Sequence, residues 1–320
     1  MKVAVTGITG FVGSHLADYI LENEPDVEII GLKRWRSPLD NIKHILGKVT
    51  LYDCDLTDLP SVISFFQKFE IDKVFHLAAQ SFVPYSYVAP IATLNTNVIG
   101  SANLLEAIRL SGQRPLIHIC SSSEVYGQPI YTPIDEKHPL NPISPYGVSK
   151  VAEDRLGWAY YKSYGMKVVI TRMFTHTGAR RGDVFFASNF AKQIAEIEKG
   201  KEPTVYVGNL ESTRTVCDVR DAVRAYWMLN ESMAGEVYNI GGSEVMTVYD
   251  VLLKLISMSS VKDKIKIKVD ESRLRPADVT MQIPNCTKFR LATKWRAEIP
   301  FTQTLKWLLD YWREYEMPQV

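Results

Sequence analysis

The chain is poor in cysteine, with only four among 320 residues (54, 120, 217 and 286) and no CxxC pair. This spacing argues against a zinc site or a disulfide framework, so we expect no metal and a reducing compartment. No apolar run approaches the roughly 20 residues of a membrane span, and the glycine-broken N-terminus is typical of a strand and turn rather than a signal peptide. An excess of charge is also missing, because 37 basic and 36 acidic residues leave a net charge of +1. We therefore expect a cytoplasmic protein that binds neither nucleic acid nor membrane.

What the sequence does contain is an alternation of short apolar runs and amphipathic stretches. The runs predicted as strands are 2–6, 27–32, 49–52, 73–77, 116–121, 167–172 and 236–241. The stretches predicted as helices are 13–22, 59–69, 97–111, 145–164, 186–200 and 302–315, with Trp307 and Trp312 of the last one in the core. Strands that are apolar almost throughout are typical of a parallel sheet covered by helices on both faces.

The sequence therefore predicts an α/β fold, with a Rossmann-type doubly wound parallel sheet and a smaller C-terminal α/β substrate-binding cap. We expect residues 1–174 and a re-entrant segment at about 215–242 to form the sheet domain. Residues 175–214 and 243–320 are expected to form the cap.

The joint between the first strand and the first helix carries three glycines, in the order Thr6-Gly7-Ile8-Thr9-Gly10-Phe11-Val12-Gly13. Gly7 permits a tight turn, Gly10 lets the backbone approach a pyrophosphate, and Gly13 allows the helix to pack closely on the strand. The helix N-terminus adds N–H donors and partial positive charge. The alternative is an ordinary strand–turn–helix joint, but its position at the first β-α joint favours a dinucleotide.

The end of the second strand indicates which dinucleotide. An NAD site usually places Asp or Glu there, whereas this chain has Arg34 and Arg36. Guanidinium groups suit a 2′-phosphate, so NADP is favoured over NAD; the alternative is a solvated basic turn. Two further strand ends fit the same edge: Asp55 and Leu56 for the adenine, and residues 77–81 for a ribose or pyrophosphate.

Tyr146 and Lys150 are four residues apart, so on a helix they share one face. A neighbouring ammonium lowers the pKa of a phenol, which makes Tyr146 a candidate proton shuttle. Such a Tyr-Lys pair is common by chance on helix surfaces. A catalytic role for Tyr146 and Lys150 is favoured because Ser122 and Glu124 end a preceding strand, on the edge where open α/β sheets bind ligands.

With these motifs the chain resembles the extended short-chain dehydrogenase/reductases that modify sugar nucleotides. Within them it is most similar to the GDP-mannose 4,6-dehydratase family and its GDP-manno-heptose relatives. The motifs that carry this likeness are the 33–37 basic loop, 78–81, 122–124, His176 with Arg180-Arg181, 208–210 with Arg214, and 275–278.

The resemblance implies a chemical sequence on the sugar. Ser122 hydrogen-bonds O4, and Tyr146, tuned by Lys150, takes the O4 proton while hydride passes from C4 to NADP. The resulting ketone acidifies C5, whose proton Glu124 removes. Ser123 or Tyr146 then helps protonate the departing C6 hydroxyl, and the hydride returns to C6.

The resemblance also implies contacts with a cofactor and a GDP-linked sugar. Together with the motifs above, it gives these cofactor contacts: Gly7, Thr9, Gly10, Phe11, Val12, Gly13, Arg34, Arg36, Asp55, Leu56, Leu77, Ala78, Ala79, Gln80, Ser81, Tyr146, Lys150, His176 and Arg181. The implied substrate contacts are Ser81, Ser122, Thr175, Lys192, Arg214, Arg275 and Asp278. The arginines in this second set suit the diphosphate.

Departures from the family pattern bear on the sugar. Thr175 stands where the family has Asn, Asp278 where it has Glu, and Trp35 lies inside the basic loop. These features are closer to the manno-heptose subgroup, so both mannose and manno-heptose remain candidate sugars.

Three other functions are compatible with these motifs. A 4-keto-sugar reductase shares the Ser-Tyr-Lys set, and a 4-epimerase does too but needs no base at C5. A non-catalytic NADP-sensing protein has no use for an intact catalytic set. The helices at 97–111 and 145–164 resemble those that pair subunits in this superfamily, so we expect a homodimer, with a tetramer as the larger alternative.

Overall fold

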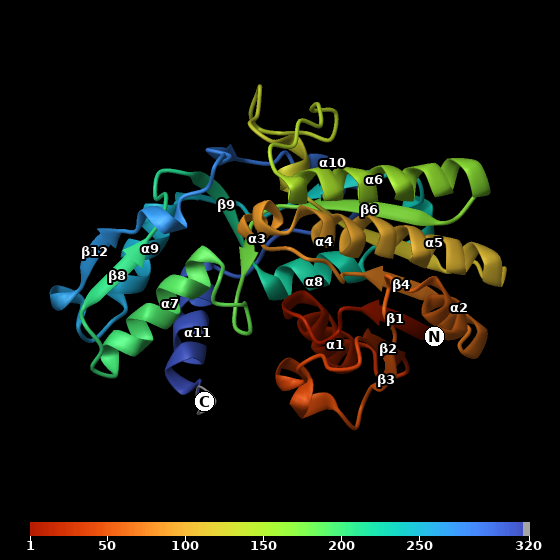
Figure 1. Ribbon diagram of the computed structural model, residues 1–320, viewed down its shortest axis with the longest axis horizontal. Coiled ribbons are helices and arrows are strands. Elements are labelled where there is room, and N and C mark those ends of the chain that lie inside the picture. The colour runs from red at the N-terminus through yellow and green to blue at the C-terminus, as the bar shows by residue number, and fades with distance from the viewer. Residues whose placement is uncertain (316–320) are drawn as a thin grey trace.

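The computed structural model describes residues 1–315. Its largest unit is a seven-stranded sheet in the order β10-β6-β5-β4-β1-β2-β3, in which all neighbours are parallel (Figure 1). The strands are β1 (Lys2–Thr6), β2 (Glu28–Lys33), β3 (Thr50–Asp53), β4 (Lys73–His76), β5 (Leu116–Ser122), β6 (Val168–Met173) and β10 (Val237–Ile240). The chain first adds β2 and β3 on one side of β1 and then adds β4, β5, β6 and β10 on the other side. The topological switch point, where the direction of strand addition reverses, therefore lies between β1 and β4. Ligands of open α/β sheets bind at the carboxyl ends of the strands beside such a point.

Helices cover both faces of this sheet, as the apolar strands require. Within β1, Val3 and Val5 belong to one hydrophobic cluster and Ala4 to another, because side chains alternate between faces. The first cluster includes α1 (Phe11–Asn23) and α8 (Val219–Trp227). The second includes α2 (Leu59–Lys68) and α5 (Gly100–Ser111), with α6 (Pro145–Tyr164) alongside. The shorter helices here are η1 (Asp40–Ile45), α3 (Val83–Val88), α4 (Pro90–Leu94), η2 (Asn95–Ile99) and η3 (Ser123–Tyr126).

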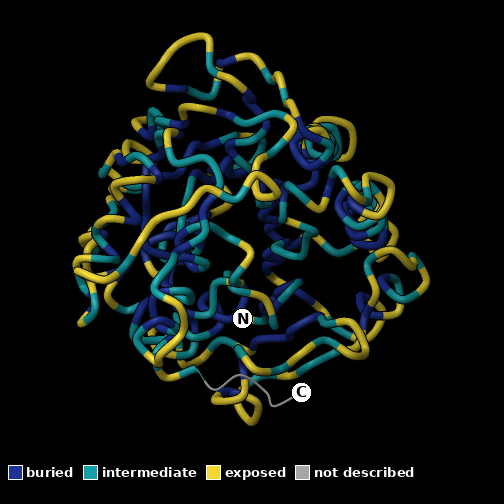
Figure 2. The backbone as a smooth tube through the Cα atoms, turned by 60° about the vertical axis from the view of Figure 1, so that its left-hand side comes forward, coloured by how far each residue is buried: buried dark blue, intermediate teal, exposed yellow. Residues whose placement is uncertain are grey.

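A smaller α/β unit follows in the chain. Its sheets are β11-β9-β13, with β7 beside β9, and the pair β12-β8. These strands are β7 (His176–Thr177), β8 (Thr204–Val207), β9 (Thr213–Asp218), β11 (Glu244–Thr247), β12 (Lys266–Val269) and β13 (Met281–Gln282). Its helices are α7 (Phe186–Glu198), α9 (Val248–Ser257), η5 (Lys262–Lys264), η6 (Glu271–Arg273) and α11 (Phe301–Glu314). The short helices η4 (Glu231–Met233) and α10 (Thr287–Thr293) pack on the main sheet instead, because Met233 and Phe289 belong to its first cluster. Helices α7, α9 and α11 enclose a separate apolar cluster that includes Trp312. Figure 2 colours the backbone by burial: the buried segments, in dark blue, lie mostly inside the molecule, and the exposed segments, in yellow, lie mostly at its edge.

The fold class is confirmed: a Rossmann-type parallel sheet and a smaller α/β unit. Strand β10 joins the edge of the main sheet beside β6, so the chain re-enters that sheet late, as the buried run at 236–241 indicated. Most predicted elements occur within one or two residues. The expected helix 97–111 begins earlier, as η2, a segment of π-helix that runs into α5. None of the strands described in the smaller unit was predicted. Five of them have two to four residues and carry almost no periodicity, and the six-residue β9 was missed as well.

The cysteines and the two tryptophans of the last helix can also be compared with the sequence expectations. The four cysteines are free thiols. Trp312 is buried in the core of the smaller unit, as expected, whereas Trp307 is half-buried with the Arg220 guanidinium over its ring. No helix in residues 1–315 combines the length and apolar character needed to cross a bilayer.

Candidate active site

The glycine turn between β1 and α1 is shaped for close backbone contact. Gly7 has φ +70°, and a Cβ there would lie 2.9 Å from the Ala78 Cα. A Cβ on Gly13 would lie 2.8 Å from the Ile8 Cα and closer still to the Gly7 carbonyl oxygen. Gly10 is the N-cap of α1 and provides no side-chain cap, so the first N–H groups of that helix are left for another acceptor. The turn therefore has the form that a pyrophosphate requires.

Thr6 and His76 lock this turn to the end of β4. The Thr6 Oγ1 accepts hydrogen bonds from the backbone N–H groups of Leu77 (3.0 Å) and Ala78 (3.1 Å) and lies 2.9 Å from His76 Nδ1. His76 Nε2 lies 2.8 Å from Ser101 Oγ. Burial lowers the pKa of His76 to about 3, so the ring is neutral and can accept from Thr6. Residues 77–81 are thereby fixed beside the glycine turn.

His176 and Arg181 also meet this turn. The His176 ring stacks on Phe11 with centroids 5.8 Å apart, and its Nδ1 lies 3.0 Å from the Phe174 carbonyl oxygen. Burial lowers the pKa of His176 to about 4, and its buried Nε2 has no hydrogen-bond partner among residues 1–315. The Arg181 guanidinium lies over the rings of Phe185 (3.4 Å) and Phe11 (4.9 Å). An orphaned ring nitrogen and an arginine beside an open helix N-terminus fit a polar, anionic ligand.

The basic loop is available to a ligand at its outer edge. Arg34, Trp35 and Arg36 are exposed, and neither arginine takes part in an ion pair within the part of the chain described. Lys33 instead pairs with Asp53 on β3. Asp55, expected near the adenine, is exposed and its Oδ1 accepts from the backbone and hydroxyl of Thr57.

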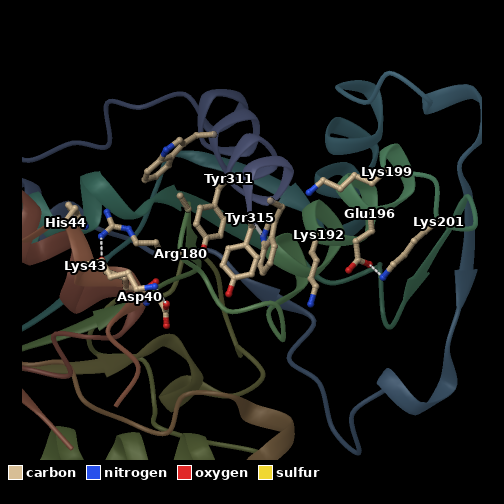
Figure 3. A pocket seen from close by; sticks show the side chains of 14 residues that line it. Asp40, Lys43, His44, Arg180, Lys192, Glu196, Lys199, Lys201, Tyr311 and Tyr315 are labelled. Carbon is tan, nitrogen blue, oxygen red and sulfur yellow. Dashed lines mark hydrogen bonds and ion pairs between the residues drawn. The ribbon is translucent and has the colours of Figure 1, made fainter. Parts of the chain in front are cut away.

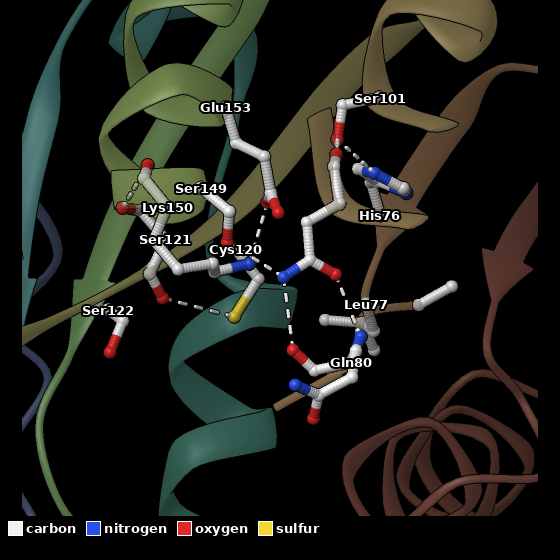
Figure 4. A network of polar contacts seen from close by, with 12 residues as sticks. His76, Leu77, Gln80, Ser101, Cys120, Ser121, Ser122, Ser149, Lys150 and Glu153 are labelled. Carbon is white, nitrogen blue, oxygen red and sulfur yellow. Dashed lines mark hydrogen bonds and ion pairs between the residues drawn. The ribbon is translucent and has the colours of Figure 1, made fainter. Parts of the chain in front are cut away.

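Tyr146 and Lys150 both lie on the buried face of α6, as their spacing predicts. Figure 4 shows Lys150 beside Ser121 and Ser122 at the end of β5. The Lys150 ammonium makes a 2.6 Å ion pair with Glu153, and the two side chains are only 5% and 1% exposed. The second carboxylate oxygen of Glu153 has no hydrogen-bond partner in residues 1–315. The sequence analysis did not single out Glu153, although its i, i+3 spacing from Lys150 was a usable signal. Lys150 is therefore a buried lysine with its own buried counter-ion.

The electrostatics of this group differ from the expectation. Burial raises the pKa of Tyr146, and this outweighs the lowering by the Lys150 ammonium and the Ser122 hydroxyl. Burial raises the pKa of Glu153 to about 7 in spite of Lys150. For Lys150, burial acts downward but the carboxylate of Glu153 outweighs it, so its pKa is raised. The predicted fall in the Tyr146 pKa is therefore wrong in net direction, because sequence spacing cannot show how deeply the ring is buried.

Asn97 joins this catalytic helix to residues 77–81. Its side chain accepts from the Gln80 N–H (2.8 Å) and donates to the Gln80 carbonyl (3.0 Å) and to the Ser149 hydroxyl (2.9 Å). The polar network in Figure 4 thus runs from the strand end of β4 to α6 without a break. Glycine turn, strand end and Tyr-Lys pair form one rigid unit.

Glu124 faces a second set of polar side chains that comes from the smaller unit. The backbone N–H of Glu124 donates to Ser122 Oγ (3.2 Å), and its Oε1 accepts from Gln282 Nε2 at 3.0 Å. Charges on Glu124 and Asp278 both act on Arg214, and Arg275 lies 3.5 Å from Asp278. We call these five residues, Glu124, Arg214, Arg275, Asp278 and Gln282, the Glu124 group.

Asp278 organises this group. Its Oδ2 accepts from Asn209 Nδ2 (2.9 Å) and Ser212 Oγ (3.2 Å), while Oδ1 faces the two arginines. Tyr87 of α3 lies near enough for Arg275, Glu124 and Asp278 to affect its pKa, which burial raises. Neither Tyr87 nor Gln282 was singled out in the sequence, where nothing but the fold connects them to residue 124.

The remaining candidate residues divide between this region and another. Ser123 is buried in η3, Thr175 is half-buried after β6, and Ser81 is exposed after β4. Lys192 is not brought to the Glu124 group. It pairs with Asp183 at 2.6 Å and lines a cavity of about 1190 Å³ beside α7 and α11 (Figure 3). None of the five predicted catalytic residues, all within the described chain, lines that cavity.

Comparisons with known proteins bear on the identity of the chain. A family model described as GDP-mannose 4,6 dehydratase matches residues 4–308. The GDP-mannose 4,6-dehydratase of Yersinia enterocolitica is 29% identical over 336 residues, which cover 93% of this chain and 90% of that protein. The GDP-6-deoxy-D-mannose reductase of Pseudomonas aeruginosa is 30% identical over 315 residues, 97% of each protein. A solved structure of RMD from Pseudomonas aeruginosa complexed with NADPH has a TM-score of 0.83 at 28% identity over 98% of each chain.

Proposed function

Because the chain belongs to the GDP-mannose 4,6-dehydratase family, we propose that it is a hydro-lyase that dehydrates a GDP-linked mannose or manno-heptose to the 4-keto-6-deoxy sugar. The observation that carries the proposal is Glu124, a carboxylate beside Ser122 and within the field of Arg214. A base at this point is needed to remove a proton from C5 and has no task in a simple ketone reduction.

The first role of the chain is to take a proton from the sugar O4. The Ser122 hydroxyl lies within hydrogen-bonding reach of Tyr146, so a sugar hydroxyl held by Ser122 can pass its proton to the phenolate form of Tyr146. Lys150 keeps its positive charge against Glu153 and favours the phenolate. A bound nicotinamide would accept hydride from C4 and later return it to C6.

The second role is proton abstraction at C5. Once C4 is a ketone, the neighbouring C–H is acidic and within the capacity of a carboxylate. Glu124 supplies that carboxylate, held by Gln282. Ser123 or Tyr146 would protonate the hydroxyl that leaves C6 as water. When hydride returns to C6, a proton must be added at C5, so the sugar loses water with no net reduction.

The cofactor part of the proposal is NADP. The glycine turn, the orphaned His176 Nε2 and Arg181 suit a dinucleotide, and a structural relative carries NADPH. Arg34 and Arg36 are exposed and would hold a 2′-phosphate.

The substrate part rests on the Glu124 group. Arg214 and Arg275 present guanidinium groups for a diphosphate, with Asp278 setting their positions. We assign nucleotide-sugar binding mainly to residues 175–214 and 243–320, of which 316–320 lie outside the described residues, and the dinucleotide mainly to residues 1–174 with about 215–242. Lys192, which pairs with Asp183 and lines the cavity beside α7 and α11, stays a prediction as a substrate contact.

A homodimer completes the proposal, with a tetramer as the larger alternative. Ile99 at the end of η2, together with Val148 and Trp158 of α6, is exposed and apolar, and monomers seldom expose such sets together. Light scattering should give twice the monomer mass, and the mass measured with NADP present distinguishes dimer from tetramer. A monomer in both conditions contradicts this part.

The deciding experiment incubates the protein with GDP-mannose or GDP-manno-heptose and catalytic NADP in deuterated water. A dehydratase gives a 4-keto-6-deoxy product with deuterium at C5 and no net change in NADPH absorbance. A second incubation supplies the GDP-linked 4-keto-6-deoxy sugar with one equivalent of NADPH. Stoichiometric consumption of NADPH there, with no product from the GDP-sugar in the first incubation, would identify the second candidate, a 4-keto-sugar reductase. The 30% identity to a reductase over 97% of both chains is the observation that favours that candidate.

A further inference from the structure

Gln282 is a buried polar residue that no sequence motif marked. It lies on β13, is 3% exposed, and donates from Nε2 to Glu124 Oε1 at 3.0 Å. A buried amide is retained only when its hydrogen bonds are satisfied, since an unpaired one is costly. The hydrogen bond to Glu124 therefore helps to compensate the cost of burying the Gln282 amide at this site.

The strand that carries Gln282 also carries the cationic end of the Glu124 group. In β13, Gln282 is the register partner of Arg214 on β9. Three residues before Gln282, the Val279 carbonyl accepts from Arg214 Nη2 at 2.6 Å, and Asp278 faces the same guanidinium. One short segment, 275–282, thus joins the two arginines to the carboxylate of Glu124.

A second glutamine joins the same two segments without touching Glu124. Gln128 donates to the Thr280 hydroxyl (2.7 Å) and accepts from the Thr280 N–H (3.0 Å). Gln128 is exposed and lies four residues beyond Glu124. The chain therefore separates two tasks: Gln128 ties the segments together, and Gln282 reaches the carboxylate itself.

We propose that Gln282 is a positioning residue that fixes the carboxylate of Glu124 for abstraction of the C5 proton and ties its placement to the diphosphate-binding segment. This rests on the proposed function. Held through Oε1, the carboxylate keeps its other oxygen available to the sugar. Without the amide, Glu124 is free to turn toward Arg214, where charge attraction would hold it away from C5.

The test compares Gln282→Leu with the matched variant Gln128→Leu in the full-length protein, using GDP-mannose or GDP-manno-heptose, whichever is turned over. Gln282→Leu should lower kcat about 10- to 100-fold with KM changed less than about twofold, because the base is misplaced while the arginines remain. Single-turnover reduction of bound NADP at C4 should stay near wild type, while deuterium entry at C5 falls with kcat. Gln128→Leu should keep both rates within about twofold.

Three results overturn the role of Gln282. One is a Gln282→Leu variant with a wild-type rate of C5 exchange. Another is an equal loss in both leucine variants, which would mean that both glutamines merely tether the segment. The third is an equal fall in the C4 and C5 steps.

If Gln282→Leu does not fold, as judged by its melting curve, the isosteric Gln282→Glu takes its place. It removes the donor and adds a repelling charge, so it should slow the C5 step at least as much; unchanged C5 exchange overturns the role. Wild-type protein that gives no C5 exchange at all would overturn the proposed function itself, which is a different outcome from wild-type exchange with an unaffected variant.

Discussion

Two parts of the site are built in opposite ways. The dinucleotide group consists of two runs of consecutive residues, 6–13 and 76–81. Its close contacts are made by the backbone, and its polar side chains Thr6 and His76 hydrogen-bond to the other run. The Glu124 group is made of side chains from η3, β9, β13 and the loop between η6 and β13. The first can vary little without loss of the turn, whereas the second depends on side chains that only the folded chain brings together. On the proposed assignment, dinucleotide binding depends mainly on local backbone geometry and sugar binding on tertiary assembly.

The largest effect should come from the chemistry of the Glu124 group. In Glu124→Gln the side chain keeps its shape and an oxygen that can accept from Gln282 Nε2, but the basic carboxylate is lost. Turnover should therefore fall about a thousandfold. The melting temperature should stay within a few degrees, and NADP affinity should be unchanged. Full activity in this variant would remove Glu124 from the mechanism.

In the dinucleotide group, the matching change is Gly13→Ala. The added Cβ meets the Ile8 Cα at 2.8 Å and the Gly7 carbonyl closer still, so we expect a loss of about 2–3 kcal/mol in unfolding free energy and weaker NADP binding. Gly47→Ala is the control, because a Cβ there meets no atom within 4 Å. Urea denaturation and NADP titration measure both effects. Equal behaviour of the two variants would contradict close packing at Gly13.

Acid should damage the dinucleotide group before the Glu124 group. Burial lowers the pKa of His15 and His176 to about 4 and of His76 to about 3, from a usual 6.5. The unfolded chain then binds protons that the folded chain does not. Stability is full above pH 6.5 and is lost as the pH falls from 6.5 toward 4, by about 2 kcal/mol per histidine at pH 5.

Hydrogen exchange at pH 7.5 and pH 5.5 can locate this loss. Protection should fall around residues 6–15, 76–81 and 174–182 before it falls in β9 and β13. His15→Gln keeps a donor for the Ala179 carbonyl and an acceptor for Arg180, so it should flatten the pH dependence. A uniform loss over both groups would show that the histidines are not its cause.

The smallest effect concerns the choice between the two dinucleotides. Replacing Arg34 and Arg36 together by alanine should weaken NADP binding about tenfold and leave NAD binding unchanged, because only NADP has the 2′-phosphate. Lys43→Ala is the control, since Lys43 pairs with Asp40 on η1. Isothermal titration with each dinucleotide measures the ratio, and equal loss for both would contradict the assignment.

The difference between consecutive residues and residues assembled from separate elements also decides how much of the site the sequence predicts. The turn at Gly7–Gly13 and the Tyr146–Lys150 pair were predictable because their signals are local: glycine spacing, strand position and helical period. Gln282 and Tyr87 were not, because they reach Glu124 only when β13 and α3 are folded against η3. Lys192 stays a prediction from the resemblance, since a lysine on a predicted helix gives no indication of which side of that helix it occupies. The net pKa direction of Tyr146 was missed because burial is a tertiary property.

The buried pair of Lys150 and Glu153 has a consequence for adapting this protein to other conditions. Glu153 holds the Lys150 ammonium at 2.6 Å, and its charge opposes the pull of Lys150 on the Tyr146 phenol. With the roles proposed above, the pH optimum of the enzyme depends on a buried carboxylate behind Lys150 as well as on the side chains that face the ligands.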